Sequence, residues 1–508
     1  MKINIIGAGI SGLTIGCYLR MNGFETEIFE SHSKAGGLCT SWKKGEYTFD
    51  GSIHWLLGSG AYSPFYQLWS ELIDMKSIRF VNHELRADIE VKDHTDNTGS
   101  NVFHLYTNLA QLEKYCNRIA PEDSKTIHKL MLSILEIQHF EIPPMIKSVP
   151  KLLSFREKIR MARFLPLLFF MYKWRKVTNF SFAEKLTNPF LKEAFQLFFD
   201  GDTVPLLVMT FPLAFNDKNA AGYPVGGSYL FAKKIEERYL SLGGRIRYST
   251  PVQKIITENG VAKGILTRDG ETILSDITIS TADWHATIFH ALEGKFVNKT
   301  ILKLNNLEKL KIYYSAFLVS LGVANQYENY PQFFRFPLVH DLVSPDGTVY
   351  KRLEAHIMNY DPTLAPAGKT VISIKFYTQN GNYWINLRNT DYQHYLRTKK
   401  EFADQMIGLL DEKMKELRKY IEVTDIATPA TFQRYTGNWQ GSTQGWLPGK
   451  NIMASSPVEY ELPGLKNFYY SSHWSQPGGG LPVAIKSGRD LVQIICKKEN
   501  KTFTVQSM

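Results

Sequence analysis

Residues 2–12 of the chain read KINIIGAGISG, and this stretch decides the fold. It begins as a short apolar run that ends directly in glycines, which is typical of a buried strand. The turn has the spacing Gly-x-Gly-x-x-Gly, and a helical pattern over 13–21 follows it up to the Asn-Gly pair at 22–23. A second strand is expected over 24–29, closed by Glu30. The opening therefore predicts a strand–helix–strand unit.

The spacing of the glycines and the acid predicts a dinucleotide site. Gly7 permits the tight turn, Gly9 lets the backbone approach a pyrophosphate, and Gly12 lets helix and strand pack closely. The start of the helix offers unpaired N–H groups and a positive dipole end to phosphates. Glu30 can accept hydrogen bonds from ribose hydroxyls, and its charge disfavours a 2′-phosphate. These residues alone do not distinguish a site for FAD from a site for NAD.

Two further glycine-rich segments favour FAD. Gly-Gly-Leu at 36–38 follows Glu30 closely, and the turn FDGSIH at 49–54 comes next. Near the end of the chain, PGGGLP at 477–482 leads into an expected helix over 483–495. Glycines before a helix present backbone N–H groups to an anion or a polar ring edge. A second site of this kind, far along the chain, suits a large cofactor that spans the domain.

The remaining patterns predict one α/β domain assembled from separate pieces. Ser228 is a candidate N-cap for a helix over 228–242, and short strands with Asn-Gly and Asp-Gly turns follow as far as 280. A single charged helix is expected over 391–420. We expect a discontinuous FAD-binding Rossmann-like domain from 1–75, 215–290 and 425–500, with an inserted mixed-sheet and helical substrate and membrane-contact domain from 76–214 and 291–424.

Composition excludes several classes of protein. The chain has 508 residues, 44% hydrophobic and 21% charged, which argues against a disordered, collagen-like or polytopic membrane protein. Its four cysteines form no C-x-x-C pair, so a disulfide scaffold or a zinc site is not expected. The N-terminus lacks a basic secretory region. We expect a cytoplasmic protein without a metal.

One basic and apolar region predicts contact with a membrane surface. Residues 147–176 contain nine lysines and arginines and only Glu157 as an acid, a net +8 out of +10 for the chain. Bulky apolar residues alternate with the basic ones, which suits a helix lying in an anionic membrane interface. The run LLFFM at 167–171 is poorly suited to nucleic acid, so none is expected as a partner. A buried helix with solvated lysines stays an alternative.

The chain resembles the phytoene desaturase-like flavoproteins, which include carotenoid desaturases, carotenoid isomerases and retinol saturases. The resemblance rests on residues 7–12 with Glu30, on 36–37 with 50–54, on YPVGG at 223–227 and on 477–482. It implies that FAD lies along these segments, with Val252 near the adenine. Many relatives carry a small residue and an acid before the last glycines, whereas this chain has SSHWSQ at 471–476. The cofactor-binding candidates are Gly7, Ala8, Gly9, Ser11, Gly12, Glu30, Ser31, Gly36, Gly37, Leu38, Val252, Gly479, Gly480 and Leu481.

The resemblance implies hydride transfer between a C–C bond of a polyene or isoprenoid lipid and the flavin, as desaturation or saturation. Such chemistry needs a placed flavin and a dry site more than acid–base groups. His54 is the catalytic candidate facing the flavin, with a structural histidine as the equal alternative. Alternatives are a redox-neutral cis/trans isomerase using reduced FAD, an amine oxidase-like enzyme, and a prenyl-lipid binding protein. The electron partner stays open, and any nicotinamide would bind transiently. Candidate aromatic residues for the cavity wall are Trp55, Tyr435, Trp439, Trp446 and Trp474.

Overall fold

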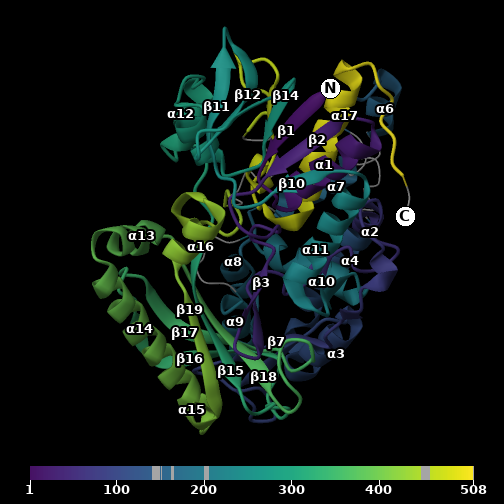
Figure 1. Cartoon of the computed structure of the whole chain (residues 1–508). Coiled ribbons are helices and arrows are strands. Elements are labelled where there is room, and N and C mark those ends of the chain that lie inside the picture. Colours follow the sequence, from purple (N-terminus) through teal and green to yellow (C-terminus); the bar gives the residue numbers. More distant parts are fainter. Residues whose placement is uncertain are drawn as a thin grey trace.

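The opening stretch folds as the strand–helix–strand unit that its sequence predicts. It comprises β1 (Lys2–Ile6), α1 (Ile10–Met21) and β2 (Glu25–Phe29). The computed structural model describes residues 1–139, 149, 152–161, 165–174, 176–198, 205–447 and 458–506 (Figure 1).

Three distant parts of the chain build one parallel sheet around this unit. Its five strands run in the order β10-β2-β1-β14-β20, and all neighbours are parallel. The added strands are β10 (Arg245–Arg247), β14 (Ile277–Ser280) and β20 (Phe468–Tyr470). The central strands β1 and β14 and the strand β20 are largely buried, as is usual for a parallel sheet that is covered on both faces.

The helices on this sheet pack closely through glycine. α1 contacts both α11 (Gly227–Ser241) and α17 (Gly480–Lys498). A Cβ at Gly16 would lie 2.7 Å from the Tyr239 ring, so the α1–α11 approach depends on that glycine. An antiparallel sheet of β11 (Val252–Glu258), β12 (Val261–Thr267) and β13 (Thr272–Leu274) lies beside β14.

A seven-stranded mixed sheet forms the second layer (Figure 1). Two strands at one edge, β7 and β8, come from the first part of the chain, and the other five come from the part beyond residue 314. In spatial order it contains β19 (Ile421–Ala427), β15 (Ser315–Val323), β18 (Thr370–Thr378), β17 (Val349–Ile357), β16 (Phe333–Val343), β7 (Leu85–Glu90) and β8 (Val102–Tyr106).

Helices cover one face of the seven-stranded sheet. α13 (Gly381–Thr390) and α14 (Tyr392–Lys413) bury apolar residues such as Trp384 and Phe402 against it. The prediction of a single helix over 391–420 was wrong. The helix ends at Lys413, and α15 (Leu417–Tyr420) follows Glu416, whose φ of 65° is left-handed. A residue in that conformation cannot continue a right-handed helix.

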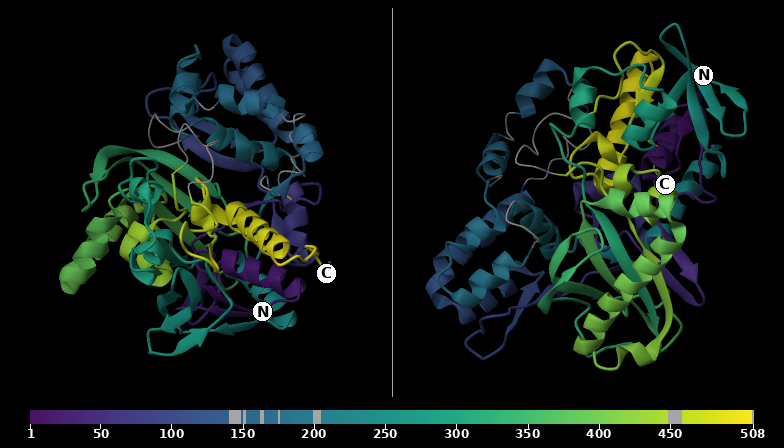
Figure 2. Two further views of the ribbon diagram at one scale, coloured as in Figure 1. Left: turned by 90° about the horizontal axis from the view of Figure 1, so that it is seen from above. Right: turned by 90° about the vertical axis from the view of Figure 1, so that its left-hand side faces the viewer.

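A helical lobe lies to one side of the two sheets (blue in Figure 2). Its core joins residues such as Leu112, Ile127, Phe195 and Leu213. The helices of this region are α3 (Leu109–Ile119), α4 (Ser124–His139), α6 (Phe155–Met161), α7 (Leu165–Trp174), α8 (Asn179–Ala183), α9 (Pro189–Gln196) and α10 (Leu207–Asp217).

Small elements connect the layers. They are β3 (Ser41–Lys44), β4 (Tyr47–Asp50), β5 (Leu56–Leu57), α2 (Pro64–Ser70), β6 (Phe80–Val81), β9 (Ala221–Pro224), α12 (Lys299–Asn305) and α16 (Pro429–Thr436). Single turns of helix lie at η1 (Met75–Ser77), η2 (Pro121–Asp123), η5 (Ala286–Ala291), η6 (Trp439–Gly441) and η7 (His473–Ser475). The α/β class with a Rossmann-like unit and further mixed sheets is confirmed.

Candidate functional site

A cavity of about 1870 Å³ lies where the parallel sheet, the seven-stranded sheet and the helical lobe meet. The carboxyl ends of β1 and β2 open into it, as do the first residues of α1 and α17. Ligands of open parallel sheets bind outside the carboxyl ends of the strands. The position of the cavity therefore agrees with the dinucleotide site that the sequence predicts.

The glycines of the opening turn differ in what surrounds them. Gly7 has a φ of 97°, which an ordinary side chain rarely adopts. A Cβ at Gly12 would lie 1.9 Å from the Gly7 carbonyl oxygen, so Gly12 permits close packing inside the protein. A Cβ at Gly9 would meet nothing within 4 Å, because Gly9 faces the cavity. The backbone at Gly9 is thus open to a ligand.

Glu30 is held rigidly at the end of β2. One carboxylate oxygen accepts from the Ala8 N–H at 2.7 Å, and the other accepts from the His32 N–H at 2.8 Å. A carboxylate has about four lone-pair directions. The Ser31 hydroxyl also donates to this carboxylate, at 3.3 Å, so about one direction remains for a ribose hydroxyl at the cavity edge that Glu30 lines.

Most of the candidates from sequence meet at this one cavity. His54 lines it, and so does every cofactor-binding candidate except Ala8 and Gly12. Ala8 is fully buried, and its N–H is bound by Glu30. The role of each candidate toward FAD stays a prediction. The lining candidates are Gly7, Gly9, Ser11, Glu30, Ser31, Gly36, Gly37, Leu38, Val252, Gly479, Gly480 and Leu481.

A buried network positions the turn that carries His54. The Asp50 carboxylate accepts from the Ser228 N–H and hydroxyl, both at 2.6 Å, and from the Ser52 N–H at 3.0 Å. The Ser228 hydroxyl oxygen accepts from the Ile53 N–H at 2.7 Å. Ser228 is therefore not the N-cap that its position suggested. The cap is Gly226, whose φ is 95°, and Ser228 ties β4 to α11.

His54 contacts residues that no sequence motif marked. Its Nε2 lies 2.9 Å from Lys375 Nζ on β18, and its ring lies 5.2 Å from that of His356 on β17. Burial, together with the Lys375 charge, holds the pKa of His54 well below its usual value, so the ring is neutral near pH 7. The sequence signal for Lys375 was a lone lysine inside the apolar strand TVISIKFYT at 370–378.

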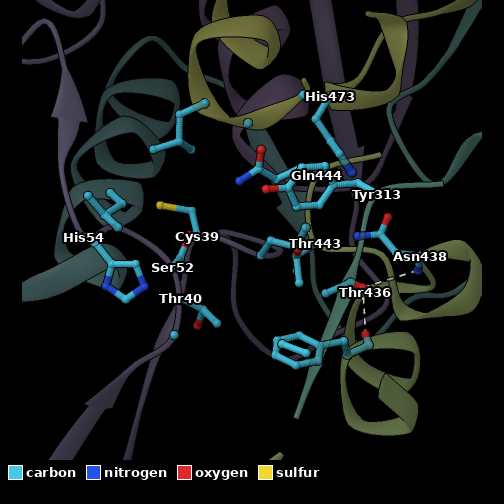
Figure 3. A pocket seen from close by; sticks show the side chains of 18 of the residues that line it. Cys39, Thr40, Ser52, His54, Tyr313, Thr436, Asn438, Thr443, Gln444 and His473 are labelled. Atoms are coloured by element: carbon cyan, nitrogen blue, oxygen red, sulfur yellow. Dashed lines mark hydrogen bonds between the residues drawn. The ribbon is translucent and has the colours of Figure 1, made fainter. Parts of the chain in front are cut away.

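The C-terminal glycines at 478–480 also line the cavity. A Cβ at Gly479 would lie 1.9 Å from the Gln444 carbonyl oxygen, whereas one at Gly478 would meet nothing within 4 Å. Figure 3 shows Gln444 and His473 on this side and Ser52 and His54 across from them. Burial lowers the pKa of His473 to about 4, and its Nε2 has no hydrogen-bond partner among the described residues.

The aromatic candidates divide into wall and core. Trp55 and Tyr435 line the cavity. The expectation for Trp439, Trp446 and Trp474 was wrong, because these residues belong to a packed cluster with Trp284 behind the wall. Trp446 and Trp474 are fully buried, with ring centres 5.1 Å apart. Large apolar rings gain more from such packing than from partial exposure in a cavity.

The residues that line the cavity are suited to binding FAD. The cavity runs from Glu30 past the open backbone of Gly9 to the open backbone of Gly478, so one elongated molecule can contact all three. The unpartnered Nε2 of His473 is available for a polar group of a bound ring. Within the described part of the chain, no three His, Cys, Asp or Glu side chains gather as a metal site.

Comparisons with known proteins agree with this geometry. The family described as NAD(P)-binding Rossmann-like domain matches residues 5–72. The chain is 22% identical to a 4,4′-diapophytoene desaturase (4,4′-diapolycopene-forming) from Methylomonas sp, over 99% of this chain and 96% of that one. It is 24% identical to the chloroplastic prolycopene isomerase of Daucus carota, over 95% and 78% of the two chains. This confirms the resemblance to the phytoene desaturase-like family.

Solved structures show that the chain shares its fold with two oxidoreductases. An oxidoreductase from Methanosarcina mazei matches with a TM-score of 0.58 and 16% identity, over 97% of this chain and all of that one. Cyclohexylamine oxidase from Brevibacterium oxydans matches with a TM-score of 0.58 and 12% identity, over 98% and 99% of the two chains. These likenesses concern the fold.

Proposed function

We propose that the protein is an FAD-dependent oxidoreductase acting on a polyene or other isoprenoid lipid, with hydride transfer between a C–C bond and the flavin. The observation that carries this proposal is the continuity of the cavity. One end is the glycine-rich dinucleotide site, and other walls are apolar. A lipid in the apolar part would therefore lie against the cofactor.

The apolar walls come from elements that are remote in sequence. The helical lobe contributes Phe198, Leu207 and Met209, and the seven-stranded sheet contributes Phe333 and Tyr350. Such walls hold a hydrocarbon chain by burial and exclude water from the reacting carbons. FAD, when bound, supplies the hydride-accepting or hydride-donating ring. The chain's own residues would orient the lipid and keep the site dry.

A second candidate reaction is redox-neutral isomerisation of the same class of lipid. It is favoured by the similarity to the Daucus carota prolycopene isomerase. The cavity serves either reaction, because both need a polyene beside a flavin. The mass of the product separates them, since desaturation or saturation changes the mass by two hydrogens and isomerisation leaves it unchanged.

The first test is the visible absorption spectrum of the purified protein, followed by lipid assays with product masses. We expect a flavin spectrum, release of FAD on denaturation, and a product that differs from its polyene by two hydrogens. An unchanged mass with a new isomer would support the isomerase reading. A protein that stays colourless with excess FAD would favour a prenyl-lipid binding protein instead.

We further propose that the protein collects its lipid at an anionic membrane surface through residues 147–176, on the cytoplasmic side. The described parts of this region expose apolar side chains at helical spacing. In α6 they are Phe155 and Ile159, which are 78% and 58% exposed, and in α7 they are Leu165, Phe169 and Tyr172. Exposed Arg156, Lys158 and Lys173 lie among them. Among the described residues, no helix is long and apolar enough to cross a membrane.

Replacing both Phe155 and Phe169 by glutamate should weaken binding to anionic vesicles by roughly tenfold or more. Burying a phenylalanine contributes about 1.5–3 kcal/mol, and the new charges would be repelled by anionic lipid. Co-sedimentation with phosphatidylglycerol-containing vesicles measures the effect. The control is Val339→Glu on β16, where the side chain is 82% exposed but lies outside the region. Equal binding of all three proteins would exclude this surface.

A further inference from the structure

A group of cationic and imidazole side chains lies together on the cavity wall. We name it the cationic cluster and define it as His54, His83, Arg86, His356 and Lys375, all of which line the cavity. A wall that only held hydrocarbon would not need them, because burying charge without a partner is costly. The cluster therefore needs a physical explanation.

Strand geometry brings the cluster to one face. His356 on β17 pairs with Ser373 on β18, so Lys375 lies two residues along β18 on the same face. Lys375 Nζ lies 2.9 Å from His54 Nε2, and the His54 ring lies 5.2 Å from that of His356. Arg86 of β7 stands over the Trp55 ring, 5.3 Å from its centre.

In the part of the chain that the structure describes, no carboxylate lies within salt-bridge distance of Lys375 or Arg86. The carboxylates that act on them electrostatically are Glu354 and Asp50. Glu354 is paired with Arg335, and Asp50 is bound by Ser228 and Ser52. Among the described residues, Asp50 is therefore left to balance both Lys375 and Arg86.

The imidazoles leave donors or acceptors unused at the same place. In the described residues His54 Nδ1 and His356 Nδ1 are buried and have no hydrogen-bond partner. His54 Nε2 is next to an ammonium group, which can only donate, so Nδ1 carries the proton and is an unused N–H donor. His356, which is 8% exposed, uses Nε2 for the Tyr360 hydroxyl at 2.9 Å. Counted over the described residues, the site thus offers one unmatched positive charge and an N–H donor.

We propose that the cationic cluster binds the carboxylate of a substrate or product that ends an apolar chain, such as a polyene acid. One carboxylate matches the single unmatched charge, and its oxygens can accept from Lys375, Arg86 and His54. A diphosphate would bring more negative charge than the cluster balances. An apolar part of the wall begins beside the cluster, because the Phe333 ring lines the cavity 5.8 Å from that of His356.

This inference rests on the proposed function, because it names the lipid that the same cavity takes. It also orients that lipid, with the carboxylate at the seven-stranded sheet and the tail toward the helical lobe. Burial lowers the pKa of Lys375 in the ligand-free protein, and a bound carboxylate would offset that effect.

The test compares two probes with the same polyene and ring, all-trans-retinoic acid and all-trans-retinol, by equilibrium dialysis against the FAD-loaded protein. We expect the acid to bind roughly tenfold or more tightly than the alcohol, as a charge-assisted hydrogen bond contributes about 1.5–3 kcal/mol. Lys375→Met should bring the ratio close to one, and Lys375→Arg should largely retain it. Arg86→Met should lower the ratio independently, in case Lys375→Met does not fold.

The matched control is Lys43→Met, because Lys43 is an exposed lysine that also lines the cavity. It should leave the ratio unchanged. Equal binding of acid and alcohol by the wild-type protein would overturn the inference. So would an unchanged preference in Lys375→Met with a shifted flavin reduction potential, because the cluster would then serve the flavin. Activity on a hydrocarbon polyene, measured in parallel, tests the proposed function separately.

Discussion

Gly9→Val is expected to abolish flavin retention while the protein without cofactor stays folded. Gly9 has an ordinary φ of −69°, and a Cβ there would meet no protein atom within 4 Å. A valine therefore costs little in the fold, but its methyl groups would occupy the space where the backbone must approach a pyrophosphate. We expect the affinity for FAD to fall by at least about 100-fold, which corresponds to about 2.7 kcal/mol.

The measurement is the ratio of flavin to protein absorbance after purification, with a titration of FAD into the apo protein and a thermal unfolding curve. Gly408→Ala is the control, because Gly408 lies in α14, outside the cavity lining, and no backbone atom blocks a Cβ there. Normal flavin content in Gly9→Val would refute the assignment of this turn. Glu30→Lys is a less selective probe, since Glu30 also binds the N–H groups of Ala8 and His32.

Asp50→Ala should destabilise the folded protein by about 3 kcal/mol and weaken flavin retention. The Asp50 carboxylate accepts two hydrogen bonds from Ser228 and one from the Ser52 N–H in a nearly water-free position. Removing it leaves buried donors unsatisfied, and each such loss costs about 1–3 kcal/mol, although the losses are not additive. The turn that carries His54 would also lose its connection to α11.

Thermal and urea unfolding of holo and apo protein measure this effect. Asp74→Ala is the matched control, because the Asp74 carboxylate also accepts from a backbone N–H, that of Lys76 at 3.0 Å, but in an exposed position. We expect that control to change stability by less than about 1 kcal/mol. A stability of Asp50→Ala equal to that of the control would mean that the network contributes little.

Local sequence patterns were sufficient to predict the strands and the helix of the Rossmann-like unit. The strand, turn and helix of residues 2–21 depend on neighbours a few positions apart, so their periodicity is visible in the sequence. The hairpin at Asn259-Gly260 was equally visible. Both residues have positive φ, at 48° and 72°, which asparagine and glycine tolerate best.

Where the sequence-based predictions failed, a distant partner or a single strained residue decided the outcome. Ser228 is of a residue type that often caps helices. Its hydroxyl instead donates a hydrogen bond to the carboxylate of Asp50, which is far away in sequence. The helix expected over 391–420 ends at Lys413, before the left-handed Glu416, although its charge pattern continues. Trp446 and Trp474 were expected in the cavity wall because they are large and aromatic. In the structure they pack against Trp284 and each other, and this packing places them in the core.

The sequence by itself determined the dinucleotide turn, the acid that follows it and the basic apolar region, because each is a contiguous pattern whose chemistry follows from spacing. Only the tertiary structure decided that the glycine turns at both ends of the chain open into one cavity, and that Lys375 and Arg86 stand beside His54 in its wall. These side chains come from two strands and a turn that are remote in sequence. These side chains come together because of the strand order and register of the seven-stranded sheet. Long-range strand pairing sets both, and local periodicity in the sequence does not reveal them.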